Sequence, residues 1–154
     1  SPSARPRHSP TVSPTSLEEL DLGGTQLTGN ISSELGLMTR LTRLDLGDNQ
    51  LTGTIPWELG LLSNLQELYL GKFSRICKSY FKLVHPITHI ATEHNKLTGT
   101  ITSELGLLSN LKTLHIGKNQ LTGNIPSELG LLSNLQMLYL KGNQLTGTIP
   151  SKLG

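Results

Sequence analysis

The residues best suited to chemistry lie in one stretch, where Cys77, His85, His89 and His94 offer the sulfur and nitrogen atoms that bind metal ions. A structural zinc site needs four such ligands, and a catalytic one needs three protein ligands that are held rigidly. Cys77 is the only cysteine in the chain, so the paired cysteines of a zinc finger are missing. We therefore predict no metal site and no metal cofactor.

The sequence has no recognisable pairing of a nucleophile with a base. Serines recur at equivalent positions such as Ser63, Ser109 and Ser133, where turn formation explains them. The glycines are also spaced by a repeat and do not form a phosphate-binding loop. We therefore predict that the chain is not an enzyme and uses no cofactor.

The elements that would position any site come from a repeat. The tetrapeptide Leu-Thr-Gly-x occurs five times at spacings of 24, 46, 24 and 24 residues, with its glycine at Gly29, Gly53, Gly99, Gly123 and Gly147. A period of this size indicates a solenoid, in which a repeat buries its apolar face only by stacking on its neighbours. Function then belongs to the surface that stacking creates.

Each repeat contains an alternation typical of a short strand. In the clearest copy, Leu44 and Leu46 are predicted to point inward and Arg43 and Asp45 outward. The same alternation recurs at Leu20/Leu22, Leu68/Leu70, Leu114/Ile116 and Leu138/Leu140. Because each repeat advances the chain by one turn, these strands should form a parallel sheet, with the rest of each repeat as the crossover.

An asparagine follows most of these strands. We expect its side chain to satisfy buried backbone groups of the next turn, as a ladder through the array. The ladder residues are Asn49, Asn95, Asn119 and Asn143, and Thr25 takes this position in the first repeat.

The full pattern L-x-x-L-x-L-x-x-N-x-L-T-G-x-I-P-x-x-L-G-x-L covers residues 17–70 and 95–154 and resembles the plant-specific class of leucine-rich repeat. That class occurs in ectodomains of receptor-like kinases and receptor-like proteins and in polygalacturonase-inhibiting proteins. The resemblance implies an α/β repeat solenoid that is curved, with a parallel sheet on its concave face and short 3-10 or helical turns and loops on its convex face. Because the chain lacks an initiator Met and stops in mid-repeat, we expect a fragment of a longer protein.

The one irregular spacing predicts an insertion. Removing residues 72–93 restores the 24-residue period, so we divide the chain into a disordered Pro/Ser-rich linker at 1–15 and a solenoid at 16–154 that is interrupted at 72–93. The interruption is alternatively an aberrant turn in which Ile87 and Ile90 form a strand of their own. It is either a basic and aromatic binding segment or a stretch without selected function, such as a gene-model artefact.

The outward positions of the predicted sheet are the candidate ligand-binding residues. We expect this face to run from acidic at its beginning to basic at its end, with two tyrosines and a histidine as anchors. The candidates are Asp21, Arg43, Asp45, Tyr69, Lys112, His115, Lys118, Tyr139 and Lys141. Trp57 is a further candidate contact on the outer side.

These features predict a non-catalytic recognition module that binds a protein, peptide or glycan ligand, and the resemblance implies that it is part of a receptor-like signalling protein. The alternatives are an inhibitor of a secreted hydrolase, and a scaffold or incomplete product without activity of its own. A net charge of +2 does not suggest nucleic acid, and no apolar run approaches the length of a membrane span. The compartment stays open, although the resemblance favours the cell surface or exterior.

Overall fold

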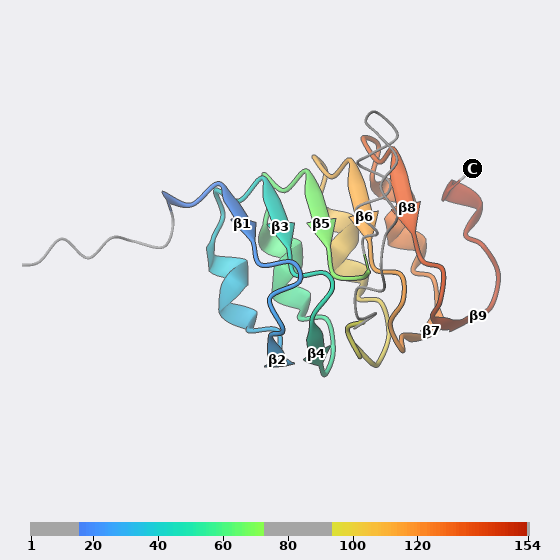
Figure 1. Cartoon of the computed structure of the whole chain (residues 1–154). Helices are drawn as coiled ribbons and strands as arrows, with labels where there is room; N and C mark the ends of the chain where they lie inside the picture. Colours follow the sequence, from blue (N-terminus) through green and yellow to red (C-terminus); the bar gives the residue numbers. More distant parts are fainter. Residues whose placement is uncertain (1–15, 73–93, 154) are drawn as a thin grey trace, which may run out of the picture.

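A computed structural model describes residues 16–72 and 94–153. Its main sheet consists of five parallel strands of three residues each, which lie side by side in chain order (Figure 1). They are β1 (Glu19–Asp21), β3 (Arg43–Asp45), β5 (Glu67–Tyr69), β6 (Thr113–His115) and β8 (Met137–Tyr139). The central leucines of neighbouring strands face each other in register, which confirms the predicted sheet.

Short 3-10 helices form the opposite side of the solenoid (Figure 1). They are η2 (Ser33–Leu37), η3 (Trp57–Leu61), η5 (Ser103–Leu107), η6 (Ser127–Leu131) and η7 (Ser151–Leu153). Between the two sides lie two small parallel pairs that the sequence analysis did not predict: β2 (Thr28–Asn30) with β4 (Gln50–Thr52), and β7 (Thr122–Asn124) with β9 (Gln144–Thr146). The family's concave sheet and convex 3-10 turns are therefore both present.

The core is a stack of leucines enclosed between the sheet and the 3-10 helices. Each turn contributes leucines from equivalent positions. In one turn these are Leu44 in β3 and Leu46 directly after it. On the other side they are Leu59 in η3 and Leu62 directly after it. Neighbouring turns cover each other, so the central turns bury these side chains completely or nearly so. Stacking of repeats thus makes the core, as expected for a solenoid.

The ladder asparagines lie at the point where the chain leaves the sheet; Asn49, Asn95 and Asn119 are buried there and Asn143 is half-buried. The side-chain oxygen of Asn49 accepts hydrogen bonds from the backbone of Thr25 (3.1 Å) and Leu27 (2.9 Å), and its amide donates to the carbonyl of Leu22 (2.8 Å). Asn95 likewise accepts from Leu51. These partners belong to the preceding turn, whereas we had expected the next one.

The register across the irregular spacing is that of an uninterrupted array. Leu68 faces Leu114 across the sheet, although 46 residues separate the two in the chain. That separation is one repeat of 24 residues plus the 22 residues of the predicted insertion. Asn95 donates to the carbonyl of Leu70 at 2.8 Å, as a ladder residue does in a regular turn. The predicted strand around Ile87 and Ile90 lies outside the described residues. Among the described residues, β5 and β6 are hydrogen-bonded directly to each other.

Candidate functional site

The candidate site lies on the face of the main sheet that points away from the 3-10 helices, which we call the concave face. Alternation along each strand sends the central leucine into the core and its two neighbours to this face. The outward residues that the sequence analysis selected are Asp21, Arg43, Asp45, Tyr69, His115 and Tyr139.

Arg43 organises the centre of this face. Its guanidinium forms ion pairs with Asp45 (2.9 Å) and with Glu67 of the next strand. The guanidinium also lies over the ring of Tyr69, with its central carbon, Cζ, 4.6 Å from the ring centroid. The Tyr69 hydroxyl donates a hydrogen bond to Glu67 at 3.2 Å. Charge pairing and a cation–π contact therefore fix these four side chains relative to one another.

The row of contacts continues across β6 to β8. The ring centroids of Tyr69 and His115 are 6.3 Å apart, and those of His115 and Tyr139 are 5.0 Å apart in a stacked arrangement. Burial lowers the pKa of His115, because removal from water disfavours the imidazolium. Burial likewise raises the pKa of Tyr69. We define this row, from Arg43 to Tyr139, as the concave cluster.

Pointing outward does not make these side chains equally accessible. Tyr69 is only 4% exposed and His115 only 7%, whereas Tyr139 is 44% exposed. We expected all three to be contact anchors. The structure instead leaves Tyr139 as the accessible ring, stacked on His115.

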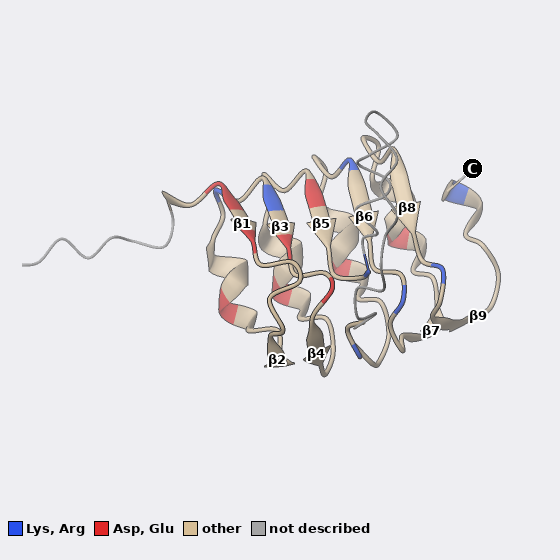
Figure 2. Ribbon diagram, in the orientation of Figure 1, with Lys and Arg blue, Asp and Glu red and all other residues tan. Residues whose placement is uncertain are grey.

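The remaining candidates do not join the cluster. Asp21 is exposed and its carboxylate accepts a hydrogen bond from the backbone of Gly23 at 3.1 Å. Lys112 is bonded through its ammonium to Gln66 at 2.9 Å, and Lys118 and Lys141 lie exposed in the loops that follow β6 and β8. Figure 2 shows the resulting gradient: acidic residues mark β1, β3 and β5, and lysines gather around β6 and β8.

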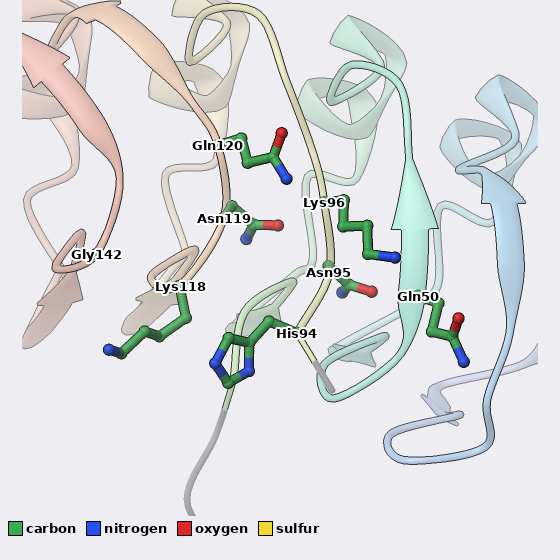
Figure 3. A pocket seen from close by; sticks show the side chains of 8 residues that line it. All are labelled: Gln50, His94, Asn95, Lys96, Lys118, Asn119, Gln120 and Gly142. Carbon is green, nitrogen blue, oxygen red and sulfur yellow. The ribbon is translucent and has the colours of Figure 1, made fainter. Parts of the chain in front are cut away.

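A pocket lies beside the strand ends, among the loops that carry the asparagine ladder (Figure 3). Its lining residues are Gln50, His94, Asn95, Lys96, Lys118, Asn119, Gln120 and Gly142. Lys96 and Lys118 extend in opposite directions from their loops, so the pocket does not focus positive charge on one point. The sequence analysis missed Gln50, Lys96 and Gln120, although each directly follows a ladder asparagine, and that position was the available signal.

The described residues were searched for groups of metal ligands and for membrane-spanning helices. Within 16–72 and 94–153, no group of three or more His, Cys, Asp or Glu side chains is placed to hold a metal ion. Of the sulfur and nitrogen donors considered first, Cys77, His85 and His89 lie outside these ranges. The same ranges contain no helix that is long and apolar enough to cross a membrane.

Comparisons with known proteins agree with the geometry. The family model for the Leucine Rich Repeat matches residues 16–38, 40–62, 110–132 and 134–154. A search of curated proteins gives no match.

The solved structures similar to this chain include several plant proteins. The ectodomain of the Arabidopsis thaliana receptor kinase GASSHO1/SCHENGEN3, in complex with CASPARIAN STRIP INTEGRITY FACTOR 2, is 41% identical over 90% of this chain, with a TM-score of 0.75. The Arabidopsis receptor kinase HAESA, in complex with the peptide hormone IDA and the co-receptor SERK1, is 33% identical over 88% with a TM-score of 0.72. A plant ice-binding protein is 31% identical over 89% with a TM-score of 0.71. The chain spans only 14%, 19% and 37% of those three proteins.

Proposed function

The chain belongs to the leucine-rich repeat family, and we propose that it is a non-catalytic recognition module that binds an extended peptide segment of a protein across its concave face. The similar structures of GASSHO1/SCHENGEN3 and HAESA contain CASPARIAN STRIP INTEGRITY FACTOR 2 and the peptide hormone IDA, respectively. That similarity supports a peptide ligand over a glycan.

The concave cluster is the observation that carries this proposal. It provides a continuous row of charged and aromatic side chains across four strands, from Arg43 to Tyr139. Because these side chains already hold one another in place, a ligand would lose less free energy in ordering them. Tyr139, which is exposed and stacked on His115, is the proposed aromatic anchor.

Charge defines the ligand further. Acidic side chains dominate the face over β1 to β5, and Lys112 and Lys141 flank its other end. We therefore propose a peptide with a basic half and an acidic half, joined by an apolar or aromatic residue that packs on Tyr139. Opposite charges on the two halves favour one orientation and reject the reversed one.

A selection from a displayed library of extended peptides, followed by calorimetric titration of the winners, tests the proposal. We expect Tyr139→Ala to weaken binding about tenfold or more. Lys141→Glu should weaken peptides with an acidic half and spare those without one. Ser133→Ala, exposed outside the strands, serves as the matched control and should leave affinity unchanged. Winners without charge polarity that bind equally to Tyr139→Ala would contradict the proposal.

A second function is favoured by a separate observation. Exposed threonines occupy the same position of successive turns, on the small strands and the segment between them: Thr28, Thr52, Thr98, Thr122 and Thr146. Each carries one hydroxyl and one methyl group, and the rank is staggered, because the register sets Thr52 beside Asn30 and Thr146 beside Asn124. Such a rank could order water at an ice surface, and one similar structure is a plant ice-binding protein.

Microscopy of ice crystals grown in the protein solution distinguishes this function. If the threonine rank binds ice, the chain should inhibit recrystallisation, and the double variant Thr98→Lys with Thr122→Lys should not. Tyr139→Ala should retain the inhibition, because it lies on the concave face. Equal inhibition by the lysine variant would dismiss the threonine rank.

A further inference from the structure

The convex side carries a row of exposed leucines next to a row of glutamates. Leu37, Leu61, Leu107 and Leu131 are 65%, 44%, 62% and 57% exposed, and each is the last residue of its 3-10 helix. The second residue of each of those helices is a glutamate. We call the two rows together the leucine–glutamate stripe, which consists of Glu34, Glu58, Glu104 and Glu128 with the four leucines.

Helix geometry places the two rows on one face. In a 3-10 helix, side chains three residues apart eclipse each other, so Glu58 and Leu61 point to the same side. The helices also stack closely: a Cβ on Gly36 would lie 2.4 Å from the carbonyl oxygen of Glu58, and one on Gly60 the same distance from that of Glu104. The leucines therefore form one continuous ridge.

The repeat pattern does not demand leucine at this position. In the segment L-G-x-L, the flanking leucines such as Leu59 and Leu62 are completely buried in the core, whereas the residue directly before Leu62 is exposed and adds nothing to that core. The helices η2, η3, η5 and η6 nevertheless all hold an exposed leucine there. A contiguous exposed apolar row of this kind marks an interaction surface.

Charge indicates what covers the ridge. None of the four glutamates forms an ion pair within residues 16–72 and 94–153, and the helices η2, η3, η5 and η6 contain no Lys or Arg (Figure 2). A hydrogen bond from the Thr102 hydroxyl lowers the pKa of Glu104 and so favours its charged form. At one end of the row, Lys152 takes the position of the glutamate in η7 and packs against Gly130. An apolar row bordered mainly by negative charge is complementary to a segment that is apolar on one side and basic at its border.

We propose that the leucine–glutamate stripe docks a basic amphipathic helix of a partner protein. The partner's apolar residues, spaced three and four apart, would pack on the leucines, and its Lys or Arg side chains would pair with the glutamates. At about 5 Å per turn, four turns span roughly 15 Å, which is the length of about ten helical residues. Trp57 is 53% exposed and directly precedes Glu58 of the stripe in η3. Its ring would add an aromatic contact to the partner helix.

The test uses the whole chain and a synthetic helical peptide of leucine and lysine with amphipathic spacing. A scrambled peptide of the same composition is the matched control, because it keeps the charge and loses the apolar face. We expect the amphipathic peptide to bind at least tenfold tighter than the scrambled one in fluorescence anisotropy, with an affinity that falls as salt is raised. Equal binding of the two peptides would overturn the proposal.

Variants locate the contact. Leu107→Asn with Leu131→Asn should reduce affinity about tenfold, and Glu58→Gln with Glu128→Gln should remove most of the salt dependence. Circular dichroism of each variant verifies that these exposed substitutions leave the fold intact. Tyr139→Ala should leave this affinity unchanged, so the result is independent of the concave ligand. Unchanged binding by the leucine variant would overturn the proposal. So would a dimer of the free chain that Leu107→Asn dissociates, because a second copy would then cover the ridge in place of a partner helix.

Discussion

Polar side chains that are buried or half-buried in this array fall into two kinds. Asn49, Asn95 and Asn119 direct both ends of their amides to backbone groups, which they satisfy across neighbouring turns. Arg43 and Tyr69 instead contact other side chains across the strands of the concave face. Loss of a residue of the first kind should therefore affect stability, and loss of one of the second kind should also affect recognition.

We predict that Asn95→Ala lowers the free energy of unfolding by about 1–3 kcal/mol, because it leaves the buried backbone N–H of Leu51 without a partner. The carbonyls of Leu46 and Leu70 lose one hydrogen bond each but still accept one from Asn49 and Asn119, respectively. The amide donates to the carbonyls of Leu46 and Leu70, and the oxygen accepts from Leu51. Urea unfolding measures the change. The control is Asn134→Ala, whose exposed amide donates a single hydrogen bond to Ser109 and should cost about 1 kcal/mol or less. Equal losses would show that the ladder is not special.

His115 gives stability a dependence on pH. Its pKa in the folded chain is lowered by burial, with Asp45 opposing this, so the unfolded chain binds a proton first as pH falls. We predict that its contribution is fully present above the ordinary histidine pKa of about 6.5 and is lost as pH falls through the folded value. Denaturant unfolding over this range should show a steeper loss for the native chain than for His115→Gln. Parallel curves for the two proteins would contradict the prediction.

At the scale of elements, close contact between turns explains a glycine that recurs in the 3-10 helices. Gly36, Gly60 and Gly106 each leave room for a carbonyl of the following turn, 2.4–2.5 Å from where a Cβ would lie. The glycine of the Leu-Thr-Gly motif has a different reason, since Gly53 and Gly123 adopt a φ of +75° that favours glycine. Turn spacing on the convex side thus depends on the first kind of glycine.

We predict that Gly60→Ala lowers the free energy of unfolding by about 1–3 kcal/mol, because the new methyl group would press on the backbone of Glu104 rather than on a flexible side chain. Thermal or urea unfolding provides the measurement. Ser63→Ala, exposed two residues beyond the same helix, should change the value by less than about 0.5 kcal/mol. A neutral Gly60→Ala would mean that the turns can separate without cost.

At the scale of the whole molecule, burial is greatest in the middle and weaker at both ends. Leu44, Leu68 and Leu114 are fully buried, whereas Leu20 and Leu138 at the equivalent positions of the end strands are only partly buried. A solenoid is stabilised by contacts between adjacent turns, so each described end turn lacks one neighbour. The middle of the array, across the irregular spacing, therefore contributes most to cooperativity.

We predict that deleting residues 72–93 raises the melting temperature. The contacts that span this gap already match a regular turn, as in the pairing of β5 with β6 and the bond between Asn95 and Leu70. Shortening the connection between β5 and β6 by 22 residues should save about 2–3 kcal/mol of closure entropy, or about 5–10 °C in a chain of this size.

Calorimetry of the intact chain and the deletion measures this effect. An equally long deletion of a regular stretch, residues 113–134, is the control and should lower the melting temperature, because it removes buried leucines such as Leu114 and Leu121. An unchanged or lower melting temperature for the 72–93 deletion would mean that this segment stabilises the solenoid.

The sequence by itself determined the repeat, the parallel sheet, the inward leucines and the restored register. Each of these follows from local periodicity, because a repeated pattern places the same residue at the same position of every turn. What only the tertiary structure decided is how side chains of different turns meet. The pairing of Arg43 with Glu67, the burial of Tyr69 and His115 beside an exposed Tyr139, and the direction of the asparagine bonds all join residues about 22 or more positions apart. The exposure of a side chain depends on those distant neighbours, and alternation along a strand carries no information about them.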